Sequence, residues 1–98
     1  MKTDEMISVT EFCTHHHVEI SFIDSLNDSG LIELIVVNDQ MFLQLSELSY
    51  LEKLVRLYYD MDINLEGIES IHHLLQRVNS MQEQILQLKN RLRIFELH

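Results

Sequence analysis

Histidines and a cysteine are the residues of this sequence whose types invite metal or nucleophilic chemistry. Histidines occupy positions 15–17, 72–73 and 98, and Cys13 is the one cysteine. Metal ligands on a helix are needed at i and i+3 or i+4, whereas neighbouring residues point about 100° apart around the axis. We therefore expect His16 to face the core between two solvated neighbours, Cys13 to be a buried small apolar residue, and no metal to be bound.

The rest of the sequence offers no arrangement suited to catalysis. A catalytic site needs a nucleophile beside a base, converging carboxylates or a glycine-rich phosphate loop. The two glycines, Gly30 and Gly67, are explained as helix punctuation, and the acidic residues are scattered as on solvated faces. The sequence therefore predicts a protein that is not an enzyme and holds no cofactor.

The length of 98 residues allows one domain, or a small domain with an appendage. A core of this size is marginal, and oligomerisation is a usual remedy. One cysteine allows no intramolecular disulfide, which fits a reducing compartment. The start lacks the features of a signal peptide, and no apolar run approaches the length of a membrane span. We expect a cytoplasmic protein with no membrane contact.

Charge is divided unevenly along the chain. From Thr3 to Glu52 there are ten acidic residues and no Lys or Arg, whereas from Lys53 to His98 six basic residues balance six acidic ones. With Lys2 the net charge is −9. The N-terminal half is thus a strongly negative body, which repels phosphate and attracts basic surfaces.

Two short helices joined by a tight turn are predicted between residues 8 and 30. Ser8 or Thr10 can cap the first helix, and Gly30 closes the second in a left-handed conformation. The inward residues are Val9, Phe12, Cys13 and His16 of the first helix and Phe22, Ile23 and Leu26 of the second. This outline predicts a helix-turn-helix.

A β-hairpin is predicted next. Residues 31–37 and 40–45 are apolar and rich in strand formers, and Asn38 and Asp39 between them tolerate the positive φ of a tight turn. A two-stranded hairpin after a helix-turn-helix is a wing, and we expect its apolar side chains to pack on the helices or against a partner.

Two further helices follow. We expect Ser46 to cap a third helix, residues 60–63 to break it, and Asn64 to cap a long helix with Glu66 in its first turn. The inward stripe of the third helix is Leu48, Leu51, Leu54, Val55 and Tyr58.

The long helix carries an unbroken heptad seam. Steps of three and four residues alternate, which keeps one apolar stripe facing a partner helix. We expect a coiled coil that joins two copies, in an orientation that the spacing leaves open; the alternative is a terminal helix packed on its own domain. The seam residues are Ile71, Leu74, Val78, Met81, Ile85, Leu88, Leu92 and Phe95.

Several of these segments resemble a known family. Residues 9–13 (VTEFC) and 30–32 (GLI) resemble the opening of the MerR-like helix-turn-helix, and residues 60–68 (DMDINLEGI) are similar to the helix junction of the chaperone modulator family (CbpM), small relatives of MerR. The pattern covers nearly the whole chain. His17 stands where a turn glycine is usual.

The resemblance implies a mainly α fold: a MerR-like winged helix-turn-helix with a short β-hairpin wing over residues 1–62, and a coiled-coil dimerisation helix over residues 63–98. It also implies a non-catalytic regulator that binds the J-domain of a DnaJ/CbpA-like co-chaperone and inhibits its stimulation of Hsp70 (DnaK). J-domains present a basic helix to Hsp70, which an acidic module could occupy. Charge and position in the sequence, rather than the resemblance, suggest the candidate contact residues Glu19, Asp24, Asp28, Glu33 and Asp39, with Phe42 as an apolar anchor.

Two other functions remain open from the sequence. One is a MerR-type DNA-binding transcriptional regulator, but residues 20–29, in the position of the recognition helix, offer Asp24 and Asp28 and no cation. Because DNA affinity comes largely from Lys and Arg on phosphates, nucleic acid is not the expected partner. The other is a dimerisation or adaptor module with some other basic partner.

Overall fold

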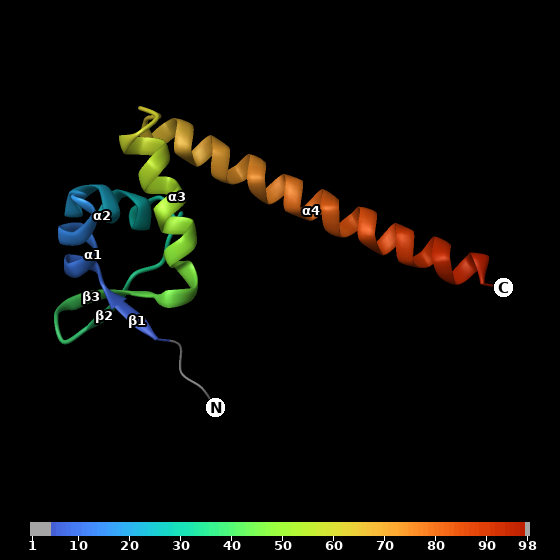
Figure 1. Ribbon diagram of the computed structural model, residues 1–98, viewed down its shortest axis with the longest axis horizontal. Helices are drawn as coiled ribbons and strands as arrows, with labels where there is room; N and C mark the ends of the chain where they lie inside the picture. Colours follow the sequence, from blue (N-terminus) through green and yellow to red (C-terminus); the bar gives the residue numbers. More distant parts are fainter. Residues whose placement is uncertain (1–4, 98) are drawn as a thin grey trace.

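Four helices and a three-stranded sheet make up residues 5–97, the part of the chain that the computed structural model describes (Figure 1). The elements follow in the order β1, α1, α2, β2, β3, a short 3-10 turn η1, α3 and α4. Residues 1–4 and 98, at the outer ends of the two predicted domain ranges, lie outside the described residues. The predicted mainly α fold with a small sheet and a long C-terminal helix is confirmed.

The sheet lies below the helices in Figure 1. Its central strand β3 (Gln40–Gln44) pairs antiparallel with β1 (Met6–Ser8) on one side and β2 (Ile35–Val37) on the other. Asn38 and Asp39 join β2 to β3 with φ values of 52° and 64°, as a type I′ hairpin turn requires. The predicted hairpin turn is confirmed.

The extent and number of the strands were predicted wrongly. Residues 31–34 are not in a strand, and Leu31 and Ile32 are instead buried in the core. Their apolar character therefore serves helix packing rather than strand pairing. The sequence prediction also missed β1, because a three-residue strand is too short to show an alternating pattern.

Helix α1 (Val9–His16) has a side-chain cap at its start and a left-handed residue after its end. Ser8 is extended, and its Oγ accepts a hydrogen bond from the backbone N–H of Glu11 at 3.3 Å, as predicted. His17 follows the helix with φ 56°, and its N–H donates to the carbonyl of Cys13. A histidine thus takes the backbone conformation that glycine adopts most easily.

Helix α2 (Ile20–Asp28) ends in a Schellman motif. Gly30 has φ 77°, its N–H donates to the Asn27 carbonyl at 3.1 Å, and the N–H of Leu31 donates to the Leu26 carbonyl at 2.9 Å. The predicted role of Gly30 is therefore confirmed. The motif turns the chain so that Leu31 enters the core directly after the helix.

The core lies between the three helices of the domain and the inner face of β3. No polar or charged side chain is buried within residues 5–97. Each fully buried aliphatic side chain contributes roughly 1.5–3 kcal/mol to stability. The six largest such residues are Ile23, Leu26, Leu43, Leu51, Leu54 and Ile68.

Helix α3 (Leu48–Tyr59) follows the 3-10 turn η1 (Leu45–Glu47) directly, and no extended capping residue separates them. Ser46 lies inside η1, and Glu47 already has helical backbone angles, so the prediction that Ser46 caps α3 was wrong. The predicted stripe is buried at Leu51 and Leu54, half-buried at Leu48 and Val55, and exposed at Tyr58.

Helix α4 (Leu65–Glu96) starts in the core and then leaves the domain (Figure 1). Asn64 Oδ1 accepts from the N–H of Gly67 at 2.8 Å, which confirms the predicted cap. Gly67 does not mark the end of a helix, as the sequence suggested. It is needed because the chain packs closely there, and a Cβ on residue 67 would lie 2.8 Å from Cγ2 of Ile63. Ile68 is fully buried, so the first turn fixes the helix to the domain.

Candidate protein-interaction surface

The exposed face of α2 carries two carboxylates and no cation. Phe22, Ile23 and Leu26 point into the core and fix the rotation of the helix about its axis. Asp24 and Asp28 are consequently exposed, one turn apart on the outer side. Both occupy the positions at which the sequence predicted partner contacts.

Two electrostatic effects make the ionised forms of these aspartates unfavourable in the isolated chain. Like charges at i and i+4 of a helix cost about 0.2–0.5 kcal/mol. Asp28 is also the last residue of α2, where the negative end of the helix dipole disfavours an acid by about 0.3–1 kcal/mol. A cation bound to this face would relieve both effects.

Glu19 immediately precedes α2 and is anchored to α3. It is exposed, and its backbone N–H donates to Oη of Tyr59 at 3.1 Å. Its Oε2 accepts from Oγ of Ser21 at 3.3 Å. Sequence reasoning named Glu19 but missed Tyr59, because a contact across 40 residues leaves no local signal.

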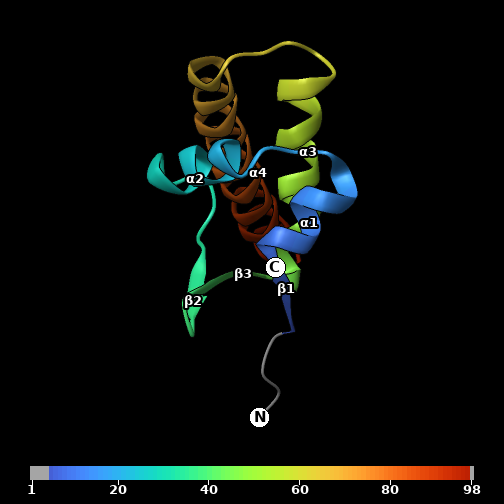
Figure 2. The same ribbon diagram turned by 90° about the vertical axis from the view of Figure 1, so that its left-hand side faces the viewer.

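The wing acids lie at two distances from α2. Glu33 precedes Leu34, whose N–H donates to Oδ1 of Asn27 at 3.1 Å, so Glu33 lies beside the C-terminal end of α2 and Asp28. Asp39 lies farther away, in the β2–β3 turn. Helix α2 and β2 occupy the same side of the domain, away from α3 (Figure 2). The five acids are thus distributed from the start of α2, where Glu19 contacts α3, to the wing, and they do not form one compact cluster.

Phe42 is half-buried on the outer face of the sheet. It pairs with Ile35 on one side and Ser8 on the other, whereas its neighbour Leu43 points into the core. Strand alternation places further apolar side chains on the outer face. These are Met6 and Val37, both exposed. Sequence reasoning missed Met6 because it missed β1.

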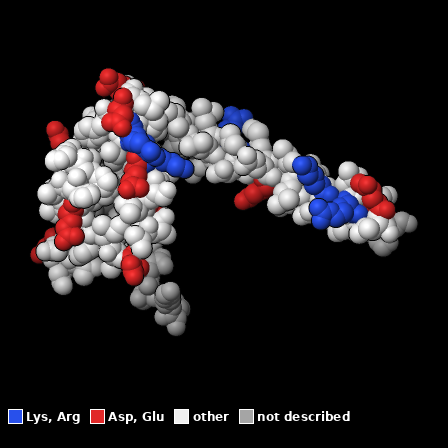
Figure 3. All heavy atoms as spheres, in the orientation of Figure 1, with Lys and Arg blue, Asp and Glu red and all other residues white. Residues whose placement is uncertain are grey.

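The charge division seen in the sequence has a spatial counterpart. On the face drawn in Figure 3, the charged side chains of the helix-turn-helix and the wing are acidic, whereas acidic and basic side chains both occur on α3 and along α4. The first cations after the N-terminal half are Lys53 and Arg56 of α3. The surface formed by α2 and the wing therefore contains carboxylates without any Lys or Arg.

Cys13 is buried, as predicted. Burial raises the pKa of its thiol above the usual value of 9.0, and the negative charge of Asp24 raises it further. The thiol is therefore protonated at neutral pH and is a poor nucleophile.

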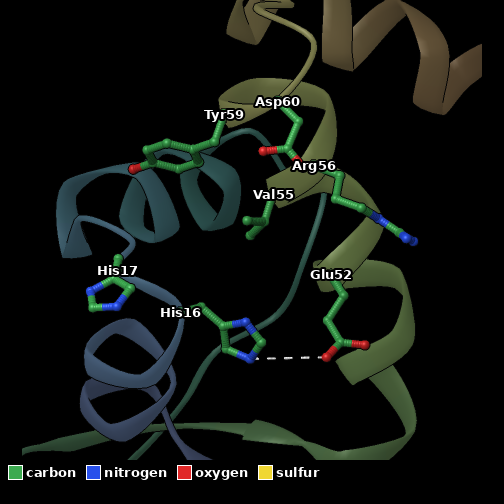
Figure 4. A pocket seen from close by; sticks show the side chains of 7 residues that line it. All are labelled: His16, His17, Glu52, Val55, Arg56, Tyr59 and Asp60. Atoms are coloured by element: carbon green, nitrogen blue, oxygen red, sulfur yellow. Dashed lines mark ion pairs between the residues drawn. The ribbon is translucent and has the colours of Figure 1, made fainter.

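A polar hollow of about 440 Å³ lies between the end of α1 and α3 (Figure 4). His16 Nε2 is 3.9 Å from Oε2 of Glu52, and the Arg56 side chain points away from both histidines. The hollow is lined by His16, His17, Glu52, Val55, Arg56, Tyr59 and Asp60. Within residues 5–97, no three His, Cys, Asp or Glu side chains gather closely enough to hold a metal ion.

The prediction that His16 faces the core was wrong. His16 is exposed at the rim of this hollow, and its ring stacks on Phe12 with the ring centroids 4.2 Å apart. The helix is only eight residues long, so its last turn extends past the edge of the core.

Comparison with known families identifies the architecture. Residues 7–90 match the family described as MerR HTH family regulatory protein. The chain belongs to this family. No curated protein matches the sequence.

Family membership accounts for the helix-turn-helix, the wing and the long helix as one unit, since the match continues from β1 well into α4. The family description is that of a regulatory protein. In this MerR-family chain, the exposed face of α2 is acidic. No helix among residues 5–97 is long and apolar enough to cross a membrane.

The seam on α4 of this MerR-family chain is open to solvent. From Leu74 to Phe95 every seam residue is 46–81% exposed, and Ile71 is half-buried. Beyond its first turns, α4 therefore does not pack on its own domain. Large exposed apolar surfaces of this kind mark interaction sites. Sequence reasoning missed four exposed apolar residues outside the seam, which are Leu75, Leu86, Ile94 and Leu97.

A groove of about 300 Å³ lies where α4 leaves α3. Ile71 and Leu75 of α4 face Leu54 and Leu57 of α3 across it. Nearby, the Tyr50 hydroxyl and Nδ1 of His72 form a hydrogen bond between the same two helices. These contacts set the direction in which the seam leaves the domain.

Proposed function

We propose that this MerR-family protein is a non-catalytic regulator that binds the J-domain of a DnaJ/CbpA-like co-chaperone and inhibits its stimulation of Hsp70. One observation carries the proposal: α2 and the wing expose carboxylates and no Lys or Arg. The position that reads DNA in a helix-turn-helix is therefore suited to a basic protein surface.

The aspartates of α2 support this proposal energetically. Asp24 and Asp28 repel each other, and Asp28 also lies at the unfavourable end of the helix dipole. Neither side chain forms a hydrogen bond or an ion pair within residues 5–97. Their charges are thus free to pair with a basic helix, with Glu33 near Asp28, Glu19 at the start of α2 and Asp39 at the wing.

Phe42 and the outer sheet face supply the apolar part of the surface. Interfaces gain most of their affinity from a few desolvated apolar or aromatic anchors rather than from charges at the rim. Phe42 is half-buried and flanked by Ile35, so it is already ordered for contact. We therefore retain Phe42 as the anchor of the proposed interface.

We further propose that the protein is a homodimer joined through the α4 seam. Seven seam residues are exposed in the single chain, and their heptad spacing suits a two-stranded coiled coil. A helix of 32 residues is about 48 Å long, far longer than the part held by the domain.

The alternative function is a MerR-type DNA-binding transcriptional regulator, with which the family match is equally consistent. Against it stands the net repulsion between phosphates and a surface that bears only acids. Apart from Lys2, the cations of the chain belong to α3 (Lys53 and Arg56) and α4, so a DNA-binding member would have to use these helices rather than α2 or the wing.

Calorimetric titration of the protein into a purified J-domain tests the proposal. Binding that weakens with salt and is lost in the double variant Asp24→Lys, Asp28→Lys would support both function and surface. The control is Glu69→Lys with Glu83→Lys, which changes the net charge equally on α4 but outside the seam. Loss in both double variants would indicate a general charge effect.

Other outcomes would redirect the proposal. J-domain binding that survives the α2 double variant would keep the function and move the site to another face. Absence of binding at low salt would refute the chaperone function. Salt-dependent binding of duplex DNA by the wild-type protein would then establish the alternative.

A further inference from the structure

We propose that a notch between the start of α2 and the end of α3 binds the side-chain cation of a Lys or Arg from a basic partner protein. This aromatic notch is lined by Glu19, Ser21, Phe22, Ser25, Tyr58 and Tyr59, and by Leu65 at the start of α4. The proposal rests on the proposed function only for the identity of the partner that supplies the cation.

Three aromatic rings form the wall of the notch. Phe22 stacks on Tyr58 with centroids 4.2 Å apart and meets Tyr59 edge-on at 5.6 Å. Tyr58 and Tyr59 are 38% and 39% exposed, so part of each ring remains open to a ligand. Aromatic rings attract Lys and Arg head groups placed over their faces.

Glu19 provides the opposite charge at the mouth of the notch. The positive end of the α2 dipole lies here and would oppose a bound cation. The Glu19 carboxylate offsets that field, and neither Lys nor Arg lines the notch. A cation therefore finds one carboxylate and the rings of two tyrosines, and the carboxylate is the component that makes the notch selective for charge.

The notch is already shaped before any partner binds. The hydrogen bond from the Glu19 N–H to Tyr59 Oη holds α2 against α3, and Phe22 is buried beneath the two tyrosines. Little ordering is then needed on binding, which favours affinity.

The size of the notch selects the ligand. It encloses about 190 Å³, which suits one side-chain head group, whereas pockets for drug-sized ligands span about 300–1,000 Å³. Because Glu19 begins α2, the notch adjoins the acidic face of that helix. A basic helix lying along α2 would place one long side chain into it.

The first test uses a small probe and does not depend on the J-domain. N-acetyl-arginine amide is titrated into the full-length protein with labelled tyrosine rings, and NMR shifts are followed. We expect saturable shifts of Tyr58 and Tyr59, smaller shifts in Glu19→Gln, and none with the neutral analogue N-acetyl-citrulline amide. Equal shifts with both compounds, or no shift with the arginine compound up to its solubility limit, would overturn the proposal.

The second test measures J-domain affinity of matched variants. Glu19→Gln and Tyr58→Leu should each weaken binding about five- to tenfold, whereas Tyr58→Phe keeps the ring and should bind like the wild type. Glu11→Gln is the control, since it removes an exposed carboxylate on α1. Thermal melting checks that each variant is folded.

The two tests fail in distinguishable ways. If the wild type does not bind the J-domain, the proposed function fails while the probe titration still decides whether the notch binds cations. If the J-domain binds but Tyr58→Leu and Glu19→Gln leave its affinity unchanged, the notch is not part of the interface and this inference is refuted.

Discussion

Asp24 and Asp28 lie one turn apart on the exposed side of α2, and Asp28 is the last residue of that helix. Each charge raises the energy of the other, and the helix dipole adds a further penalty at Asp28. An arrangement that costs stability in the free protein and suits a cation is typical of a binding surface, because function and stability make opposite demands there.

Replacing Asp28 with Asn should therefore stabilise the protein and weaken its binding to the partner. We expect the free energy of unfolding to rise by about 0.5 kcal/mol, which is roughly 2–4 °C in Tm for a domain of this size. J-domain affinity should fall roughly two- to fivefold, since one exposed ion pair is lost. Thermal melting at fixed protein concentration and calorimetry measure the two effects.

A matched variant controls this prediction. Glu83→Asn removes one negative charge from α4 outside the seam and should leave J-domain affinity unchanged. A decrease in the stability of Asp28→Asn would contradict the electrostatic argument, because it would indicate that Asp28 makes a favourable contact.

Features with a local physical cause could be predicted from the sequence. Ser8 and Asn64 cap helices, Gly30 closes one, and Asn38 with Asp39 forms the hairpin turn, as expected. Each depends on the conformational preferences of one or two residues, which the sequence states directly.

Features that depend on contacts between distant segments were missed. Strand β1 exists because Ile7 pairs with Leu43, and Gly67 is required because the chain packs closely against Ile63. The same holds for the site. The acidity of α2 could be predicted from the sequence, whereas the contact of Glu19 with Tyr59 forms only when α2 packs on α3.

The seam on α4 gives a second prediction. Ile85 and Leu86 are adjacent and similarly exposed, at 52% and 59%, but only Ile85 belongs to the seam. Ile85→Glu should weaken self-association at least about 30-fold, because two carboxylates would be buried in each coiled coil. Leu86→Glu should have little effect. Sedimentation equilibrium decides, and equal effects of the two variants would contradict pairing through the seam.

The orientation of the two α4 helices is a third prediction, and we expect it to be antiparallel. The groove between α3 and α4 leaves Ile71 and Leu75 partly uncovered, and Phe95 at the far end of the seam is 81% exposed. Antiparallel pairing brings Ile71 opposite Phe95 of the second copy and buries both ends. Parallel pairing sets Ile71 opposite Ile71 of the second copy and brings both domains to the same end of the coiled coil.

Cysteine cross-linking measures the orientation. Antiparallel spacing sets Val78 opposite Leu88 of the second copy, so mixing Val78→Cys with affinity-tagged Leu88→Cys should give a disulfide between tagged and untagged chains. Parallel pairing would join only identical variants. The wild type is the control, because its one cysteine is buried.

The hydrogen bond between Tyr50 and His72 leads to the last prediction. It joins α3 to α4, and Tyr50→Phe removes it while keeping the ring. Deleting such a bond costs about 1 kcal/mol of unfolding free energy. We expect this loss in urea unfolding at neutral pH.

The same variant should change the dependence of stability on pH. Burial raises the pKa of Tyr50 above its usual value of 10.0, so above that pH the unfolded chain loses its proton before the folded one. The folded state then binds more protons, and the stability of the wild type falls as pH rises through 10. Burial also raises the pKa of Cys13 from 9.0, but that contribution is common to both proteins. Urea unfolding over this alkaline range should therefore show a shallower decline for Tyr50→Phe, and parallel curves would show that Tyr50 titrates alike in the folded and unfolded chains.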